Sequence, residues 1–298
     1  MSETVLTAGG SSRFEPIALS SESTVVAEFE ADPAETTRYQ SEAELEAELV
    51  RLLREQAYEY LPITTEQDLI ANLRTQLEAL NRIEFTDGEW QRFFTTVIAS
   101  ANDSLREKTV RIQENHVEAF RREDGSTKNI ALIDKAHIHN NRLQVINQYE
   151  VPGVASADGG RPVQRANRYD VTILVNGLPL VHVELKRRGV DIREAFNQIK
   201  RYQRDSFWSG SGLFEYVQLF VISNGTLTKY YSNTVRASHL DEQSRHRRPA
   251  KRTSNSFEFT SWWADAGNRP ITDLVGFTRT FFAKRCLLNV ALRRSGGE

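Results

Sequence analysis

Two carboxylates and one lysine stand at a spacing that suits metal-assisted cutting of a phosphodiester. Thirteen residues separate Asp170 from the tripeptide Glu184-Leu185-Lys186. Mg²⁺ prefers oxygen ligands and is commonly held by one or two carboxylates, with water and substrate phosphate completing its shell. A lysine beside such an ion can orient or help deprotonate the attacking water and balance charge on the phosphorane. If the fold brings these three side chains together, their chemistry predicts a hydrolytic site in which Asp170 and Glu184 hold the metal and Lys186 is the catalytic cation.

Two predicted strands position these residues. They run over 169–175 and 179–186, on either side of Asn176-Gly177, a dipeptide typical of hairpin turns. Because side chains alternate along a strand, His182, Glu184 and Lys186 share one face of the second strand. His182 either hydrogen-bonds substrate or fills the edge of the site.

The length of the turn decides what lies opposite Asp170. A three-residue turn, 176–178, sets Asp170 against Glu184, whereas a two-residue turn sets it against Val183. We prefer the three-residue turn because it gathers the aliphatic residues of both strands on one apolar face. Facing carboxylates repel each other in a sheet, and a divalent cation removes that repulsion. The alternative is a surface hairpin whose charged side chains merely face water.

The rest of the chain predicts an α/β fold with a mixed central sheet and a helical N-terminal flank. Residues 1–40 are expected to form a flexible acidic tail, and 41–298 one domain. That domain would comprise a helical flank (about 41–125), a catalytic core (about 130–235) and a C-terminal helical segment (about 261–292). In the flank, Ser41 and Glu44 form a capping box ahead of a leucine-rich helix. Between 136 and 150 we expect one or two strands, including one at Ile138.

The amino-acid composition predicts an intracellular protein that does not span a membrane. The single cysteine, Cys286, excludes an internal disulfide framework and fits a reducing, cytoplasmic setting. No signal peptide is recognisable, and no apolar run approaches the roughly 20 residues that span a bilayer. Residues 1–50 carry a net charge of −9, which leaves +7 on the remainder of a chain whose total is −2. This asymmetry is compatible with an acidic tail ahead of a body that meets phosphate.

These residues resemble the PD-(D/E)xK nuclease superfamily, and a longer stretch is similar to the restriction (R, HsdR) subunit of type I restriction-modification enzymes. That similarity runs from about Tyr39 to the C-terminus, and is carried by Arg168-Tyr169-Asp170, the following residues 171–177, Glu184-Leu185-Lys186-Arg187-Arg188-Gly189, residues 193–198, Tyr202 and residues 220–225. One departure is Tyr169, where the superfamily name implies proline. The resemblance implies a restriction-endonuclease-like core that cuts double-stranded DNA with Mg²⁺, for which Mn²⁺ may substitute.

The resemblance also implies further site residues. Gln198 and Tyr202 match a Gln-x-x-x-Tyr pair on the helix after the catalytic strand, and their spacing places both on one helix face toward the DNA backbone. Arg187 and Arg188 would neutralise phosphates near the scissile bond. The superfamily often carries an acid on its first helix near the metal, for which Glu48 is favoured here over Glu44.

The family resemblance further predicts binding partners, and it predicts which activities belong to other parts of the enzyme. The chain has no G-x-x-x-x-G-K-[ST] sequence, so ATP use is expected only in the full-length subunit, which adds a translocase motor. We expect a fragment whose partners are DNA and the modification and specificity subunits, and whose cutting is independent of sequence. Two alternatives stay open: another PD-(D/E)xK enzyme, such as a repair nuclease, or a DNA-binding or subunit-docking module that is inactive in isolation.

Overall fold

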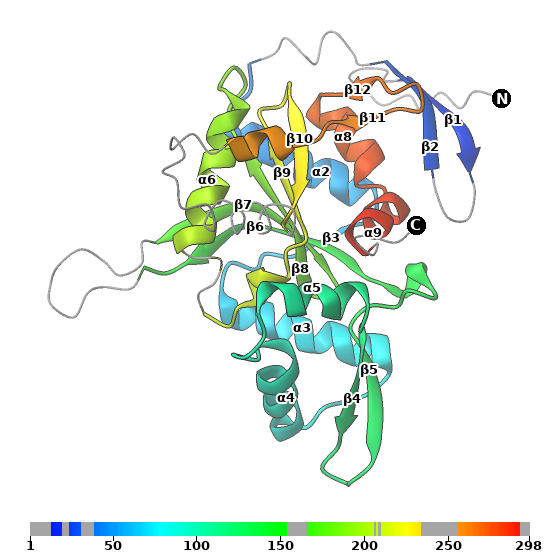
Figure 1. Cartoon of the computed structure of the whole chain (residues 1–298), viewed down its shortest axis with the longest axis vertical. Coiled ribbons are helices and arrows are strands. Elements are labelled where there is room, and N and C mark those ends of the chain that lie inside the picture. The colour runs from blue at the N-terminus through cyan, green and yellow to red at the C-terminus, as the bar shows by residue number, and fades with distance from the viewer. Residues whose placement is uncertain are drawn as a thin grey trace, which may run out of the picture. The chain divides into compact units, whose positions relative to one another are not determined.

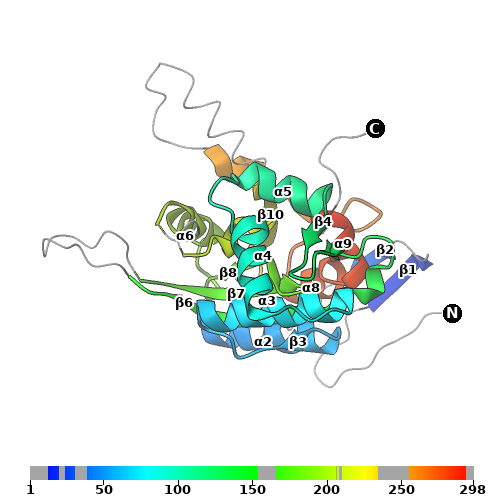
Figure 2. The same cartoon turned by 90° about the horizontal axis from the view of Figure 1, so that it is seen from below.

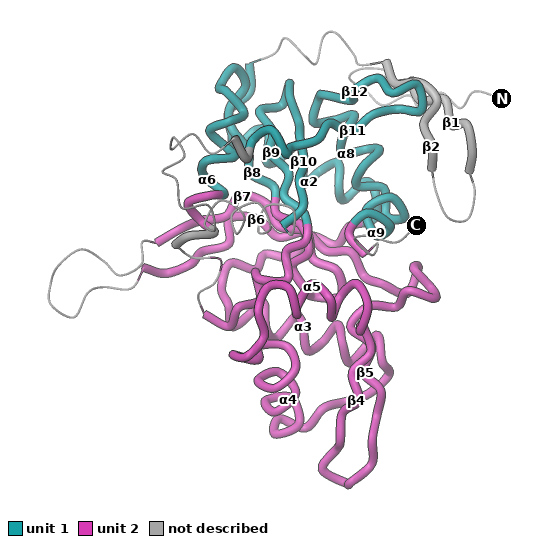
Figure 3. Tube along the Cα trace, in the orientation of Figure 1, with its two compact units in different colours: residues 1–57, 183–199, 219–290 teal, residues 58–182, 200–218, 291–298 magenta. Residues whose placement is uncertain are grey.

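A computed structural model gives the structure of the chain in two compact units. It describes the backbone of 13–19 and 24–30, and the residues 39–153, 166–205, 207, 210–233 and 255–292. Unit 1 comprises 1–57, 183–199 and 219–290, and unit 2 comprises 58–182, 200–218 and 291–298 (Figure 3). Among the described residues, no helix is long and apolar enough to cross a membrane.

A six-stranded sheet has the order β10-β9-β8-β7-β6-β3 (Figure 1). Its strands are β3 (Glu59–Tyr60), β6 (Leu143–Val151), β7 (Asn167–Val175), β8 (Leu178–Leu185), β9 (Leu219–Ser223) and β10 (Thr228–Ser232). Strands β3 and β6 are parallel, whereas the pairs β6–β7 and β9–β10 are antiparallel. The predicted α/β fold with a mixed sheet is therefore confirmed. Every residue of β8 is buried, so this strand has a covered face on both sides.

Unit 2 holds most of the helical flank, which Figure 2 shows from below. Its elements are α3 (Glu66–Asn81), α4 (Asp87–Phe93), the π-helical η1 (Phe94–Ile98), α5 (Leu105–Gln113), and the 3-10 turns η2 (Ile138–Asn140) and η3 (Leu213–Tyr216). A hairpin that sequence reasoning missed, β4 (Val117–Arg121) with β5 (Thr127–Ala131), follows α5. Phe93 of α4 and Phe120 of β4 meet edge to face at 5.3 Å, which ties the hairpin to the helices.

Unit 1 contains α2 (Glu42–Glu55), the start of α6 (Ile192–Asp205), the 3-10 turn η4 (Asn255–Phe259), the short strands β11 (Trp263–Ala264) and β12 (Pro270–Ile271), and the helices α8 (Leu274–Phe281) and α9 (Lys284–Leu292). The predicted capping box at Ser41 is present, and the predicted leucine face of α2 is buried at Leu45, Leu49, Leu52 and Leu53. Strands β1 (Arg13–Leu19) and β2 (Thr24–Glu30) pair antiparallel within the range expected to be a flexible tail. The rest of that range up to 38 lies outside the described residues, so its flexibility stays a prediction.

The turn between β7 and β8 has two residues, so the predicted three-residue turn is wrong. Asn176 and Gly177 have φ angles of 50° and 82°, and two positive φ angles in succession are what a tight two-residue hairpin turn requires. Asn176 also accepts the backbone N–H of Arg142 at 2.8 Å. A Cβ on Gly177 would lie 2.6 Å from the Cα of Leu73, so helix α3 leaves room only for glycine there. The pairing of Asp170 with Glu184 was inferred from the three-residue turn, so the two-residue turn removes the reason for it.

The strand predicted at Ile138 is also wrong, because residues 138–140 form the 3-10 turn η2. Asp134 accounts for the difference: its carboxylate accepts the His137 N–H and the Asn140 side-chain amide, both at 2.7 Å. A short acid that bonds to nearby donors stabilises a local turn in competition with a strand. Strand β6 starts after it, at Leu143.

Candidate active site

Glu184 and Lys186 lie at the end of β8 and meet each other. The Glu184 side chain is completely buried, and Lys186 is 8% exposed. The Lys186 ammonium lies 3.2 Å from Oε1 of Glu184 and donates to the Leu185 carbonyl at 2.9 Å. The backbone N–H of Lys186 donates to the carbonyl of Ser223 on β9 at 2.8 Å, which fixes the end of the strand. Residues two apart on a strand share a face, and this pair does so as predicted.

The acid of the first helix that lies near Lys186 is Glu42. Its Oε1 is 3.9 Å from the Lys186 ammonium. Glu44 instead accepts the N–H of Ser41 at 2.8 Å in the capping box. Glu48 accepts the side-chain amide of Gln40 at 2.6 Å. The family resemblance favoured Glu48 as the helix acid near the metal, and that role stays a prediction.

Gln40 connects the start of α2 to the segment after β8. Its backbone carbonyl accepts the N–H of Arg188 at 3.0 Å, and its side-chain oxygen accepts Nη2 of Arg188 at 2.6 Å. Its amide nitrogen donates to Glu48. Nη1 of Arg188 donates to Thr226 at 2.9 Å. Arg188, predicted to meet DNA phosphates, is thus held in a protein network, whereas Arg187 beside it is exposed.

Asp170 and His182 belong to unit 2. Burial lowers the pKa of His182 to about 4, although the negative charge of Asp170 acts in the opposite direction. His182 is therefore neutral near pH 7. Its ring contacts those of Tyr169, Phe207 and Tyr202, with centroids 5.4, 5.3 and 6.1 Å away. His182 is an interior residue of an aromatic cluster, and Tyr169, at the position where the superfamily name implies proline, is buried in that cluster.

Tyr202, predicted to contact DNA, has a packing role in this structure. Its side chain is buried, and its hydroxyl donates to the backbone carbonyl of Arg168 at 2.9 Å, two residues before Asp170. Gln198, one turn earlier on α6, is partly exposed. The contacts of Gln198 and Tyr202 with DNA stay predictions.

The residues around Lys186 fit a hard divalent cation. Within the described ranges there is no group of three or more His, Cys, Asp and Glu residues that would form a protein-only metal cage. Glu42 and Glu184 are nevertheless two carboxylates that share one ammonium, so the cluster keeps a net negative charge when all three are ionised. A small number of oxygen donors suits Mg²⁺, which keeps several water ligands. A structural zinc site would instead need four nitrogen or sulfur ligands.

The mixed six-stranded sheet flanked by helices, with an acid and a lysine two residues apart at the end of a central strand, defines a restriction-endonuclease-like α/β protein. Residues 39–239 match the family model described as type I restriction enzyme R protein N terminus. The chain belongs to this family. All the residues discussed for the site lie within the matched range.

Individual relatives agree with the family. The chain is 46% identical over 281 residues to the type I restriction enzyme EcoprrI endonuclease subunit of Escherichia coli, which covers 94% of this chain and 82% of that protein. It is 37% identical over 251 residues to the type I restriction enzyme SsaAORF53P endonuclease subunit of Staphylococcus saprophyticus. That match covers 82% of this chain and 23% of the staphylococcal protein, so the chain spans about a quarter of this longer relative.

Proposed function

We propose that this chain is the nuclease part of a type I restriction enzyme, a Mg²⁺-dependent endonuclease that hydrolyses phosphodiester bonds of double-stranded DNA. The observation that carries the proposal is the buried Glu184 with the Lys186 ammonium 3.2 Å away and a second carboxylate, Glu42, 3.9 Å from the same ammonium. Family membership supports the same reading.

Each residue of the site has a role in the proposal. Glu184 and Asp170 would hold the metal, Asp170 on the strength of its spacing to Glu184 and of the family match. Glu48 keeps its predicted place as the helix acid near the metal, and Glu42, 3.9 Å from the Lys186 ammonium, is a second candidate. When bound, Mg²⁺, or Mn²⁺ in its place, would polarise the phosphate and lower the pKa of a coordinated water. Lys186, fixed by its bonds to Glu184 and Leu185, would orient the attacking water and offset charge on the phosphoryl oxygens.

The proposal also covers contacts with DNA and with partner subunits. Arg187, exposed beside the site, would neutralise a phosphate, and Gln198 would reach the DNA backbone from α6. The modification and specificity subunits would supply target recognition, which leaves cutting here independent of sequence. ATP would serve the motor of a full-length subunit, and the complex would work in the cytoplasm.

Asp170→Asn and Glu184→Gln test the proposal in the assembled restriction complex with ATP and Mg²⁺. Both variants should lose plasmid cleavage while ATP hydrolysis and translocation persist. On the chain alone, calorimetric titration with Mn²⁺ and a short DNA duplex should show weaker metal binding for both variants than for wild type. Glu78→Gln, an acid of α3 paired with Arg74 in unit 2, is the matched control and should leave cleavage and metal binding unchanged. Cleavage at the wild-type rate by either site variant would refute the assignment of that residue.

A further inference from the structure

Two cations of unit 1 approach the same aromatic ring. The Arg193 guanidinium, in the first turn of α6, lies 4.6 Å from the ring centroid of Phe257, and the Lys229 ammonium of β10 lies 5.0 Å from it. Lys229 also lies 4.6 Å from the ring of Trp262. Phe257 belongs to η4, which its contact with Phe196 holds beside α6 (Figure 1). Helix α6, strand β10 and the segment 257–262 therefore build one surface, called here the cation–ring patch.

The charge of the cation–ring patch is not balanced locally. The Lys229 ammonium donates to the hydroxyl of Thr260 at 3.0 Å, a neutral partner. In the part of the chain that the structure describes, neither Arg193 nor Lys229 forms an ion pair with a carboxylate, and exposed Glu258 pairs with neither. Burial lowers the pKa of Lys229, and the nearby charge of Arg193 lowers it further. Two like charges near one ring repel each other, and an anion that contacts both would offset that repulsion.

One ring of the patch, Trp262, is 37% exposed, and Phe259, two residues after Phe257, is 43% exposed. A folded chain rarely leaves large aromatic side chains in water next to unpaired cations unless the surface binds something. Double-stranded DNA offers both complements, because its phosphates match the cations while the C–H groups of its deoxyribose rings can pack against an indole. An acidic peptide would match the charges and leave the rings without a partner.

We propose that Arg193, Lys229 and Trp262 form a second contact site for double-stranded DNA, in which the two cations hold one backbone phosphate and Trp262 packs against the adjoining sugar. The site is distinct from the Glu184–Lys186 cluster and contributes to holding DNA, not to bond breaking. Arg193 supplies a planar guanidinium and Lys229 a point charge, and both are held in place by Phe257 before DNA arrives. The inference rests on the proposed function, since it takes DNA as the substrate.

Salt-dependent DNA binding tests this site. Fluorescence anisotropy with a labelled 30-base-pair duplex in EDTA, from 50 to 200 mM salt, would compare wild type with Arg193→Gln, Lys229→Gln and the double variant. Each single substitution should weaken binding about three- to tenfold and lower the salt slope by about one, because one ionic contact with phosphate is lost. The double variant should lower the slope by up to about two. Trp262→Leu should weaken binding without changing the slope.

Controls separate this inference from the proposed function. Lys128→Gln, which removes an exposed cation from β5 in unit 2, should leave affinity and slope unchanged. Lys186→Met should lose most of the cleavage activity and still bind DNA with a steeper salt slope than the double variant. A failure of wild type to cut with its partners would leave the binding result standing. A wild-type slope in the double variant, or no binding by wild type at 50 mM salt, would overturn the inference. Arg193 is exposed, so Arg193→Gln decides the question if Lys229→Gln fails to fold.

Discussion

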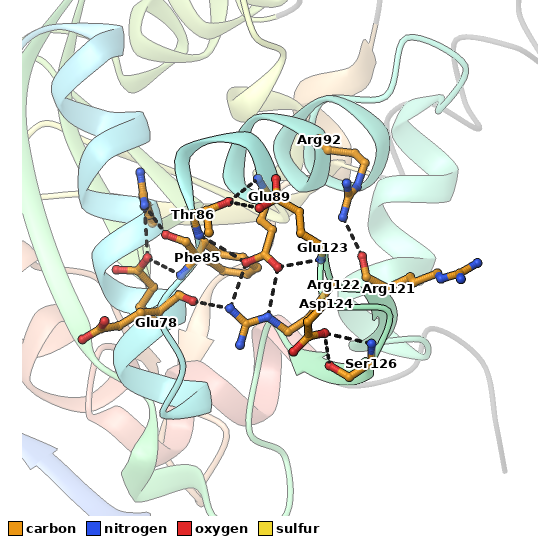
Figure 4. Close-up of polar contacts among 12 residues, drawn as sticks. Glu78, Phe85, Thr86, Glu89, Arg92, Arg121, Arg122, Glu123, Asp124 and Ser126 are labelled. Atoms are coloured by element: carbon orange, nitrogen blue, oxygen red, sulfur yellow. Dashed lines mark hydrogen bonds and ion pairs between the residues drawn. The ribbon is translucent and has the colours of Figure 1, made fainter.

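Unit 1 and unit 2 each bury a glutamate against a cation, and the two clusters differ in how the charge is balanced. In unit 2, both oxygens of Glu89 accept from Arg122, at 3.0 and 2.9 Å, and also from the backbone N–H groups of Glu123 and Thr86 (Figure 4). One acid meets one base, and local donors surround the acid. In unit 1, the ammonium of Lys186 lies 3.2 Å from the carboxylate of Glu184 and 3.9 Å from that of Glu42.

The difference is the basis for giving the Glu89 cluster a structural role and the Lys186 cluster the proposed catalytic one. The Glu89 cluster is neutral and joins the N-terminus of α4 to the β4–β5 hairpin, so a metal ion would gain nothing there. In the Lys186 cluster two carboxylates lie near one ammonium, and of these Glu184 is buried and Glu42 is half exposed. Burial of an acid beside a base is thus common to both clusters, and the second carboxylate near Lys186 is what supports the proposed metal-dependent reaction.

Lys186→Met should have the largest effect. Losing the ammonium that orients water and offsets phosphoryl charge should lower the rate of DNA cleavage by about 10²- to 10³-fold. Plasmid cleavage in the assembled complex measures this, with circular dichroism to check the fold and Lys128→Gln as the control. A cleavage rate within threefold of wild type would mean that the Lys186 cluster, like the Glu89 cluster, is structural.

Glu89→Ala should act on stability instead. It leaves Arg122 and the N–H groups of Thr86 and Glu123 without their acceptor, and should lower the free energy of unfolding by about 3 kcal/mol. Urea denaturation of the chain measures this. Asp124→Ala, in the turn of the same hairpin where Asp124 accepts from Ser126, is a matched control with a smaller expected loss. An unfolding free energy equal to wild type for Glu89→Ala would contradict the structural role.

Acid should weaken the Glu89 cluster in a defined window. The hydrogen bonds from Arg122, followed by that from Glu123, lower the pKa of Glu89 to about 2 from an ordinary value of 4.5. A carboxylate with a lowered pKa stabilises the fold fully above its unfolded pKa, and this contribution is lost as the pH falls from 4.5 toward 2. Urea denaturation between pH 6 and pH 3 should therefore show a steeper loss for wild type than for Glu89→Gln. If the unfolding free energies of wild type and Glu89→Gln fell equally with pH, Glu89 would not be the cause of the acid sensitivity.

Gln40→Ala should have the smallest effect of the four substitutions. It removes the hydrogen bond that Arg188 donates to Gln40 and the one that Gln40 donates to Glu48, which should lower the free energy of unfolding by about 1–2 kcal/mol. Cleavage should slow severalfold, because the start of α2, which carries Glu42, is held less firmly. Gln56→Ala, at the other end of α2, removes a bond to the Thr278 carbonyl and should cost stability without changing cleavage. Equal cleavage by the two variants would show that Gln40 is merely structural.

Local patterns predicted much of the fold and part of the site. The capping box at Ser41, the buried leucines of α2 and the pairing of strands around Asn176-Gly177 depend on neighbours in sequence, and they are present. The adjacency of Glu184 and Lys186 follows from strand alternation alone. The turn length was misjudged because apolar patterning was weighed above the positive φ angles that Asn-Gly supplies.

What the sequence did not predict depends on long-range packing. That Glu42, and not Glu48, meets Lys186 depends on how α2 lies against the end of β8, and no local pattern encodes this. The burial of Tyr202 likewise follows from the aromatic cluster around Tyr169, whose members come from distant parts of the chain. The cation–ring patch joins α6, β10 and η4 in the same way.

Each unit is built from three separate stretches of the chain, and this has a consequence for synthesis. Unit 1 needs residues 1–57, 183–199 and 219–290, so its first helix must wait for most of the chain to leave the ribosome before its partners exist. Contacts between residues so far apart close slowly, because loop-closure entropy is lost before they form. Until then α2 exposes its row of leucines, and the nascent chain depends on chaperones, or on rapid completion, to avoid aggregation.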